Sequence, residues 1–328
     1  MNMGWTLAVL QGARLMGQGA LVAGAVGVLS FVMTRALPGD AAYRIAAGRY
    51  GYDLVDTAAA EAVRAELGLD QPVWRQLLHW LGDLLQFRLG SSMVSGDPVM
   101  DEITHQLGHT LQLSLAAWLL AMVLGLLLGG WSALRGTHWS ARWIQPLCTV
   151  LRASPAFVLG VVLMLALGVH LDWLPVAGHG EAIYLVLPAL ALALTLVPGM
   201  TQVVSQRLQQ VLASDAFEFA LTKGMPLRAA LWRHGLPALA LGTLAYAGMQ
   251  LVLLIEGVVV VESLVAWPGI GHALVHAVIS RDVPMIQGTA LAMGLLFVLL
   301  NGLVDAGVQW LDPRLREPAP QVTPGSTA

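Results

Sequence analysis

Charged side chains are scarce in this sequence. Only 11% of its 328 residues are Asp, Glu, Lys or Arg, whereas a typical soluble domain has about 25%. So little charge leaves too little polar surface to cover a water-soluble body. The net charge of −3 also supplies no basic field for nucleic acid. The composition therefore disfavours a soluble protein, and nucleic acid is not expected among its partners.

Cysteine and lysine each occur once. Cys148 lies in an apolar run, so the chain cannot form an internal disulfide framework. Lys223 stands in the segment LTKGM, which lacks the glycine-rich lead-in of a phosphate-binding loop. No HExxH or GxSxG motif is present either. We therefore expect no catalytic residues and no cofactor, and any ATP hydrolysis that drives the protein should belong to another subunit.

Long apolar segments are what the sequence does contain. Hydrophobic residues make up 57% of the chain, and the mean hydropathy is +0.70. A helix needs about 20 apolar residues to cross a bilayer, where every backbone polar group must be satisfied internally. The first such segment is too long for a signal peptide and is read as retained. The sequence predicts an all-α polytopic membrane protein with six spans, at residues 15–34, 111–134, 143–169, 183–204, 237–261 and 286–311.

The distribution of basic residues predicts an orientation. If the N-terminus is cytoplasmic, most of the basic residues fall in inner segments, and Arg281 is the one basic residue of the short outer loops. Both termini are then cytoplasmic. Four regions follow: 1–35 with the first span, an extracytoplasmic segment 36–102, a core 103–311, and a tail 312–328 that is predicted to be disordered. Within the second region, residues 56–67 and 73–87 read as helices, the latter amphipathic.

The segment between the fourth and fifth spans, 205–235, is long, and its residue types predict two short helices. Asp215 favours the first turn of a helix, Gly224 ends that helix, and Pro226 opens a second one over 227–234. Two short helices with charges of both signs could enter a groove on a soluble partner and transmit its motion to the spans. The alternative is an ordinary solvated loop.

This segment resembles the EAA loop of the permease subunits of binding-protein-dependent ABC importers. The resemblance is carried by Asp215, the run Glu218-Phe-Ala220-Leu-Thr-Lys223-Gly224, and Arg233-His234. Further segments are similar to the dipeptide/oligopeptide/nickel branch of that family. They are Leu37-Pro-Gly-Asp40, Leu67-Gly-Leu-Asp-Gln-Pro72, Leu89-Gly-Ser-Ser92, Ser154-Pro155, Trp173-Leu-Pro175, Val260-Val-Glu262, Trp267-Pro-Gly-Ile-Gly271, Arg281-Asp282 and Leu311-Asp-Pro-Arg314.

The resemblance implies a fold, a function and partners. The fold is that of a type I ABC importer permease in the bacterial inner membrane. The function is to translocate peptides delivered by a solute-binding protein. The partners are a second permease subunit, expected to form a heterodimer with this one, and two ATPase subunits. The ATPases would grip the coupling residues, which are Asp215, Glu218, Ala220, Lys223, Gly224, Arg228, Arg233 and His234.

Alternatives remain open. Nickel or glutathione import is compatible with the same family. A secondary transporter driven by an ion gradient is the alternative from another class. Such transporters usually show inverted repeats and acidic or histidine relays within their spans, and here repeats are absent and charges in the spans are sparse.

Two charged residues stand where similar permeases usually carry small ones, Arg152 and Glu256. At 1.5 Å per residue they lie about 14 Å and about 28 Å from the inner ends of their spans, so direct pairing is not expected. We hypothesise that Glu256 faces the translocation path near its outer mouth and favours cationic or zwitterionic cargo. A carboxylic acid held neutral against a neighbouring helix is the alternative. Glu262, Pro268 and Gly269 are assigned to the same path.

Histidines form two pairs at helical spacing, His105 with His109 and His272 with His276. That spacing can chelate a metal, but two ligands do not make a site, and no metal is predicted. Between Glu262 and the sixth span, the segment 263–278 is apolar yet broken by proline and glycine. We expect a partly buried scoop helix there, at the outer face.

Overall fold

The computed structural model describes residues 3–36, 39–50, 56–66, 71–86, 88–135 and 142–311. Within these residues every regular element is helical, and strand-like pairing is limited to an isolated bridge between Ser91 and Pro98. The all-α class predicted from the sequence is confirmed. The predicted tail, 312–328, lies outside the described residues.

Four helices are long and apolar enough to cross a bilayer unaided. Two more candidate spans are interrupted by a bend, and counting each as one crossing gives up to six, as the sequence predicts. The continuous helices are α1 (Met3–Ala36), α5 (Val99–Leu134), α9 (Ala182–Leu212) and α14 (Val283–Leu311). The bent spans are α7 (Ile144–Ala153) with α8 (Ala156–Leu163) and the π-helical η1 (Met164–His170), and α12 (Leu236–Leu264).

The third predicted span is therefore not one straight helix. α7 ends at Ala153, Ser154 adopts extended backbone with ψ 122°, and Pro155 follows with ψ 150°. Proline has no N–H to donate within a helix, and its ring disfavours the α conformation of the preceding residue. The chain consequently stops one helix at Ala153 and starts another at Ala156. Apolar length predicts a crossing here, but the local chemistry of Ser154-Pro155 decides its shape.

The helices form two compact units. The first consists of Met1–Trp118, Pro155–Leu194 and Leu253–Leu299, and the second of Leu119–Ser154, Thr195–Val252 and Leu300–Ala328. The core of the first unit includes Val99, Ile103, Ile270, Ala277, Met285 and Ile286, which join α5, α13 (Ile270–Ser280) and α14.

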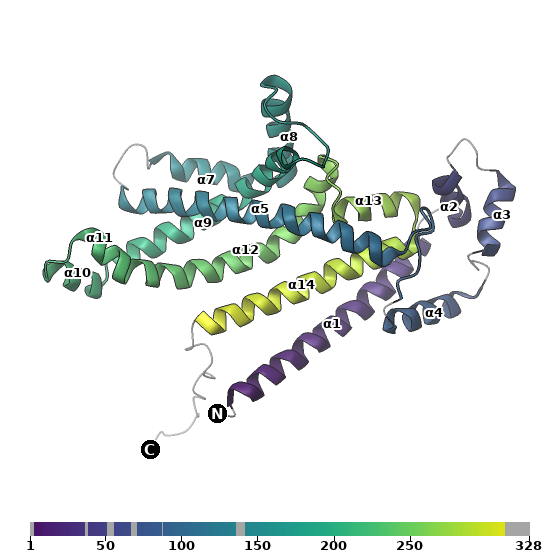
Figure 1. The fold of residues 1–328 in the computed structure, drawn as a ribbon, viewed down its shortest axis with the longest axis horizontal. Coiled ribbons are helices and arrows are strands. Elements are labelled where there is room, and N and C mark those ends of the chain that lie inside the picture. Colours follow the sequence, from purple (N-terminus) through teal and green to yellow (C-terminus); the bar gives the residue numbers. More distant parts are fainter. Residues whose placement is uncertain are drawn as a thin grey trace, which may run out of the picture. The chain divides into compact units, whose positions relative to one another are not determined.

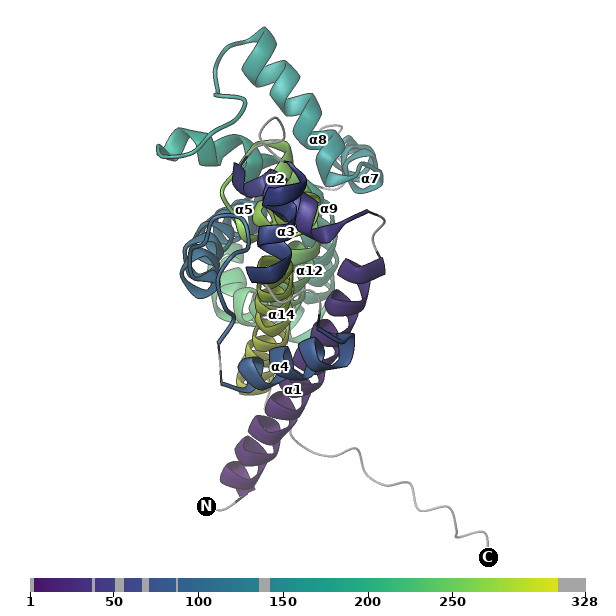
Figure 2. The same ribbon diagram turned by 90° about the vertical axis from the view of Figure 1, so that its right-hand side faces the viewer.

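Three short helices lie within residues 36–102, the segment that the sequence predicts to be extracytoplasmic. This segment belongs to the first unit. α3 (Thr57–Glu66) and α4 (Val73–Leu85) match the two predicted there, whereas α2 (Ala41–Tyr50) was not predicted. Asp40 explains α2, because its Oδ1 accepts the N–H of Ala42 at 2.9 Å as a helix cap. α2 and α3 lie side by side, and α4 lies beside α1 (Figures 1 and 2).

In the second unit, α5 and α9 approach each other closely through glycine. A Cβ on Gly125 would lie 2.5 Å from the Met200 side chain, and one on Gly129 would lie 2.7 Å from the carbonyl oxygen of Thr201. Small residues four apart let two membrane helices bring their backbones together. This contact fixes the C-terminal half of α9, which leads into α10 (Asp215–Thr222).

Candidate functional site

The segment after α9 folds into a pair of short helices, α10 (Asp215–Thr222) and α11 (Leu227–Ala230), which Figure 1 shows turned back on one another. Gly224 makes the turn with φ +83°, a left-handed conformation that glycine adopts without strain. Its N–H donates to the carbonyl of Leu221 at 2.9 Å, and the N–H of Met225 donates to that of Ala220 at 3.2 Å. These two bonds define a Schellman cap, so the predicted role of Gly224 as a helix stop is confirmed.

A small apolar core holds the two helices together. Phe217, Ala220 and Ala230 are buried, and Val211, Leu212, Met225 and Leu231 pack around them. We call residues 211–235 the coupling hairpin. Ala220, one of the predicted coupling residues, therefore lies inside the hairpin and contributes to its rigidity.

The second helix of the hairpin does not end where the sequence predicts. α11 continues through the π-helical η2 (Leu231–Gly235) directly into α12. Pro237 lacks the N–H that would bond the carbonyl of Arg233, and the wider π turn directly before it accommodates that loss. The hairpin is thus an extension of the fifth span, so displacing one displaces the other.

The outer surface of the coupling hairpin is partly apolar. Phe219 and Trp232 are 60% and 74% exposed, and Leu221 and Leu227 are also exposed. Lys223 extends its ammonium group 4.5 Å from the centre of the Phe219 ring. Five of the predicted coupling residues are exposed on the same hairpin: Asp215, Glu218, Lys223, Arg228 and Arg233. The side chain of His234 is not among those that the structure describes. An uncovered apolar patch rimmed by both charge signs is the composition of a protein docking surface.

A second site lies in the first unit, around Glu262. Its carboxylate is fully buried, at 0% exposure. Oε1 accepts the Thr110 hydroxyl of α5 at 2.6 Å, and Oε2 accepts the N–H of Gly271 at 2.8 Å. The Thr110 oxygen accepts the N–H of Ile270, also at 2.8 Å. The carboxylate therefore caps the N-terminus of α13, where unpaired N–H groups and the helix dipole favour negative charge.

The turn leading into α13 is built around that carboxylate. Trp267 donates its indole N–H to the carbonyl of His109 at 3.1 Å, which ties the turn to α5. A Cβ on Gly269 would collide with the Glu262 carboxylate, and one on Gly271 would lie 2.5 Å from the Cα of Val259. The structure thus brings Glu262, Gly269 and the adjoining Pro268 together. α13 lies in the segment where a scoop helix is predicted. Its position at the outer face, and the assignment of these residues to a translocation path, stay predictions.

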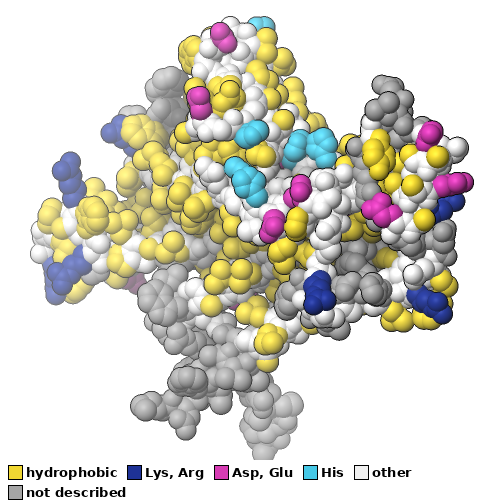
Figure 3. All heavy atoms as spheres, turned by 45° about the vertical axis from the view of Figure 1, so that its right-hand side comes forward, with side chains coloured by type: hydrophobic (Ala, Val, Ile, Leu, Met, Phe, Trp, Pro, Cys, Tyr) yellow, Lys and Arg dark blue, Asp and Glu magenta, His cyan; other side chains and the backbone are white. Residues whose placement is uncertain are grey.

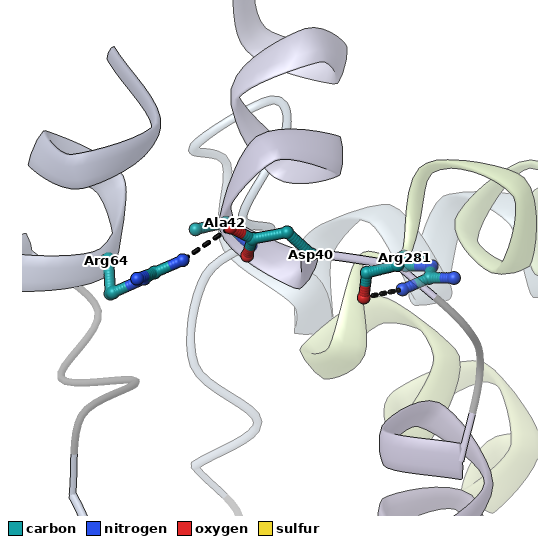
Figure 4. A network of polar contacts seen from close by, with 5 residues as sticks. Asp40, Ala42, Arg64 and Arg281 are labelled. Atoms are coloured by element: carbon teal, nitrogen blue, oxygen red, sulfur yellow. Dashed lines mark hydrogen bonds and ion pairs between the residues drawn. The ribbon is translucent and has the colours of Figure 1, made fainter. Parts of the chain in front are cut away.

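A third set of contacts anchors the segment that the sequence predicts to be extracytoplasmic. Asp282, 3% exposed, accepts the Ser92 hydroxyl and the N–H groups of Met93 at 3.1 Å and Met285 at 3.3 Å. Its neighbour Arg281 donates to the carbonyl of Gly39 at 2.9 Å, and Asp40 pairs with Arg64 (Figure 4). In the sequence, Arg281-Asp282 stands out only through its similarity to the permease family, with no partner predicted for either residue. Ser92 lies 190 residues from Asp282, and Gly39 lies 242 residues from Arg281, so no local pattern could have identified these two contacts.

Histidine side chains gather on one face beside acidic ones (Figure 3). The two predicted pairs are in contact, with ring centres 4.9 Å apart for His105 and His109 and 4.5 Å apart for His272 and His276. Burial, and secondarily the neighbouring His276, lowers the pKa of His272. Within the described residues, no three His, Cys, Asp or Glu side chains are placed to hold a metal ion. The side chain of Glu256 lies outside those described, so its predicted orientation is untested.

Comparison with known proteins adds sequence and fold relationships. Residues 121–317 match the family described as binding-protein-dependent transport system inner membrane component. The chain is 36% identical over 289 residues to a glutathione transport system permease protein, GsiC, of Pectobacterium atrosepticum, covering 88% of this chain and 93% of that protein. It is 34% identical over 299 residues to a putative peptide transport system permease protein of Brucella abortus, covering 89% and 94%.

A solved structure shares the fold. The inward-facing MetNI methionine ABC transporter matches with a TM-score of 0.52 and 16% identity, over 65% of this chain and 97% of the matched chain. At that identity the likeness concerns the fold alone. It agrees with the helical architecture described above.

Proposed function

Because this chain belongs to the family of inner membrane components of binding-protein-dependent transport systems, we propose that it imports peptides as one permease subunit of an ATP-driven transporter. It is a transport subunit and a multi-pass inner membrane protein. In the proposal it pairs with a second permease, two ATPase subunits hydrolyse ATP, and a solute-binding protein delivers the cargo. Both termini and the coupling hairpin then face the cytoplasm.

The observation that carries the ATPase part of this proposal is the coupling hairpin. Its internal core and Schellman cap make it a rigid lever, its exposed Phe219 and Trp232 offer a surface for a soluble partner, and its second helix is continuous with α12. A motor that changes shape on binding ATP could therefore shift a span by moving the hairpin. A ligand shifts such an equilibrium only through its different affinity for the two states, and the permease itself needs no nucleotide site.

The cargo is proposed from the relatives. One is named for glutathione transport and another for peptide transport, and glutathione is itself a peptide. We therefore propose di- or oligopeptides as the cargo class, with glutathione as the alternative within it. Selection among peptides would lie mainly in the binding protein.

Reconstitution tests the proposal. The complex of this chain, its sister permease, both ATPases and the loaded binding protein should take a labelled dipeptide into proteoliposomes only when ATP is present. Omitting the ATPases should abolish uptake. Uphill uptake by this chain without any ATPase, driven by an ion gradient, would favour the secondary transporter and overturn the proposal.

A further inference from the structure

α7 and α9 carry a polar stripe that the contacts described so far do not explain. On α7, Gln145, Thr149 and Arg152 follow one another at four and three residues, which places them on one side of the helix. On α9, Gln202, Gln206 and Gln209 do the same. We call these six residues the glutamine–arginine face. All six side chains are exposed, and all belong to the second unit.

The other side of α7 shows that this exposure is not simply contact with lipid. Trp143, Leu147 and Val150 are also exposed, and they are apolar, as expected of side chains that meet acyl chains. Arg152 and Gln202 fall inside the predicted spans 143–169 and 183–204, and polar or charged groups at bilayer depth face a protein partner or a water-filled path instead. Gln206 and Gln209 continue the same face beyond the predicted end of the fourth span. The two sides of one helix therefore have different surroundings in the membrane.

The glutamine–arginine face is hollowed. Two cavities, of about 370 and 400 Å³, share Gln145 and Gln202 in their walls. Arg142 lines one of them and Arg152 the other, and no acidic side chain lines either cavity among the described residues. The cavities thus combine positive charge with primary amides, which can both donate and accept hydrogen bonds.

Arg152 is held but not neutralised. Its Nη1 donates to Oε1 of Gln202 at 3.2 Å, and this is its one hydrogen bond in the described part of the chain. A guanidinium group has five N–H donors in a fixed fork that matches a carboxylate. Gln202 accepts one of these donors, and Arg152 lines the cavity of about 400 Å³.

We propose that the glutamine–arginine face lines the transport path and contacts the cargo there, with Arg152 binding the free carboxylate of a peptide and the glutamine amides pairing with its peptide groups. This inference rests on the proposed function and narrows it, because a cationic metal complex without a carboxylate would be repelled by the same face. Cargo selection is then shared between the binding protein and this subunit.

Transport kinetics test the role of Arg152 in the complete reconstituted complex. Arg152→Gln should lower the initial uptake of a dipeptide with a free carboxylate about tenfold, the loss expected for one charge-assisted hydrogen bond, and Arg152→Lys should restore part of it. Stimulation of ATP hydrolysis by the loaded binding protein should persist. Arg135→Gln is the matched control, since Arg135 is also exposed in the second unit but stacks on Trp131, and it should leave uptake unchanged. Wild-type uptake by Arg152→Gln would overturn the inference.

A second measurement applies even if Arg152→Gln fails to assemble. A photoreactive side chain at Thr149, on the face, should label a radioactive dipeptide during turnover, whereas the same group at the adjacent Val150 should not. Labelling of the sister permease alone from Thr149 would identify the face as a subunit interface and overturn the inference. A wild-type complex that hydrolyses ATP but imports no peptide would instead overturn the proposed function.

Discussion

The carboxylate of Glu262 and the backbone N–H of Gly271 are joined by a hydrogen bond of 2.8 Å inside the first unit. With the 2.6 Å bond from Thr110, it connects three helices, α5, α12 and α13, through one buried side chain. A buried carboxylate is tolerated only when its oxygens are hydrogen-bonded. Glu262 therefore acts first as a structural centre of the turn between α12 and α13.

Replacing Glu262 by Gln should destabilise the protein. An amide presents only one acceptor oxygen. If that oxygen accepts the N–H of Gly271, the NH₂ group faces Thr110 and the Thr110 O–H loses its acceptor. The expected loss is about 1–3 kcal/mol, the penalty for an unsatisfied buried polar group. Thermal unfolding of the purified protein in detergent measures it. Glu181→Gln, at an exposed position, is the control, and equal stability of the two variants would contradict the structural role.

Two glycines of the same region should differ sharply when changed to alanine. A Cβ on Gly271 would lie 2.5 Å from the Cα of Val259, whereas one on Gly257 would meet nothing closer than Leu192 at 3.9 Å. Gly271→Ala must therefore push α13 away from α12 and should lower the unfolding temperature, while Gly257→Ala should be tolerated. Unfolding of both variants at the wild-type temperature would contradict the close contact between Gly271 and Val259.

The sequence predicts the elements of this region but not their junctions. The apolar run broken by Pro268 and Gly269 indicates a turn and a scoop helix, because proline and glycine act locally. The bond from Thr110 to Glu262 spans 152 residues, and periodicity carries no information about such a pair. A reading of Glu262 as a path residue follows from its charge in an apolar run, and its hydrogen bonds become visible only in three dimensions.

Asp282 should control the order of the segment that follows α4. Removing its carboxylate by Asp282→Ala frees Ser92 and the N–H groups of Met93 and Met285. Hydrogen exchange over residues 88–98 should become faster, because the segment loses its anchor to the start of α14. Asp97→Ala, at an exposed position of the same segment, should leave that exchange nearly unchanged. Similar exchange in both variants would contradict the anchoring role.

Gly224 should be essential to the coupling hairpin. A β-branched residue at φ +83° is strongly disfavoured, so Gly224→Val should open the Schellman turn and separate α10 from α11. Co-purification of the ATPase subunits and ATP-dependent uptake should both fall. Gly108→Val provides the control, because Gly108 is helical and a Cβ there meets nothing within 4 Å. Full assembly and transport with Gly224→Val would contradict the role of the coupling hairpin as a rigid lever.

The coupling hairpin is the part of the site that the sequence predicts best. Asp215, Gly224 and Pro226 act through the local chain, as first-turn acid, left-handed cap and helix start, and the structure places each accordingly. Two features needed the structure. Ala220 faces the hairpin core, and α11 continues into α12 through a π turn that no simple propensity predicts. Likewise, α2 depends on the cap by Asp40, a residue that stands out in the sequence only as part of the family resemblance.

Site-specific photocrosslinking tests the central claim, that a separate ATPase grips the coupling hairpin. A photoreactive residue would replace Phe219 on the hairpin or, as the control, Leu78 on α4, since both side chains are 60% exposed. In membranes containing the complete transporter, the account predicts a crosslink to the ATPase subunit from position 219 and none from position 78. A transport-competent complex that gives no ATPase crosslink from position 219, or the same crosslink from both positions, would contradict it.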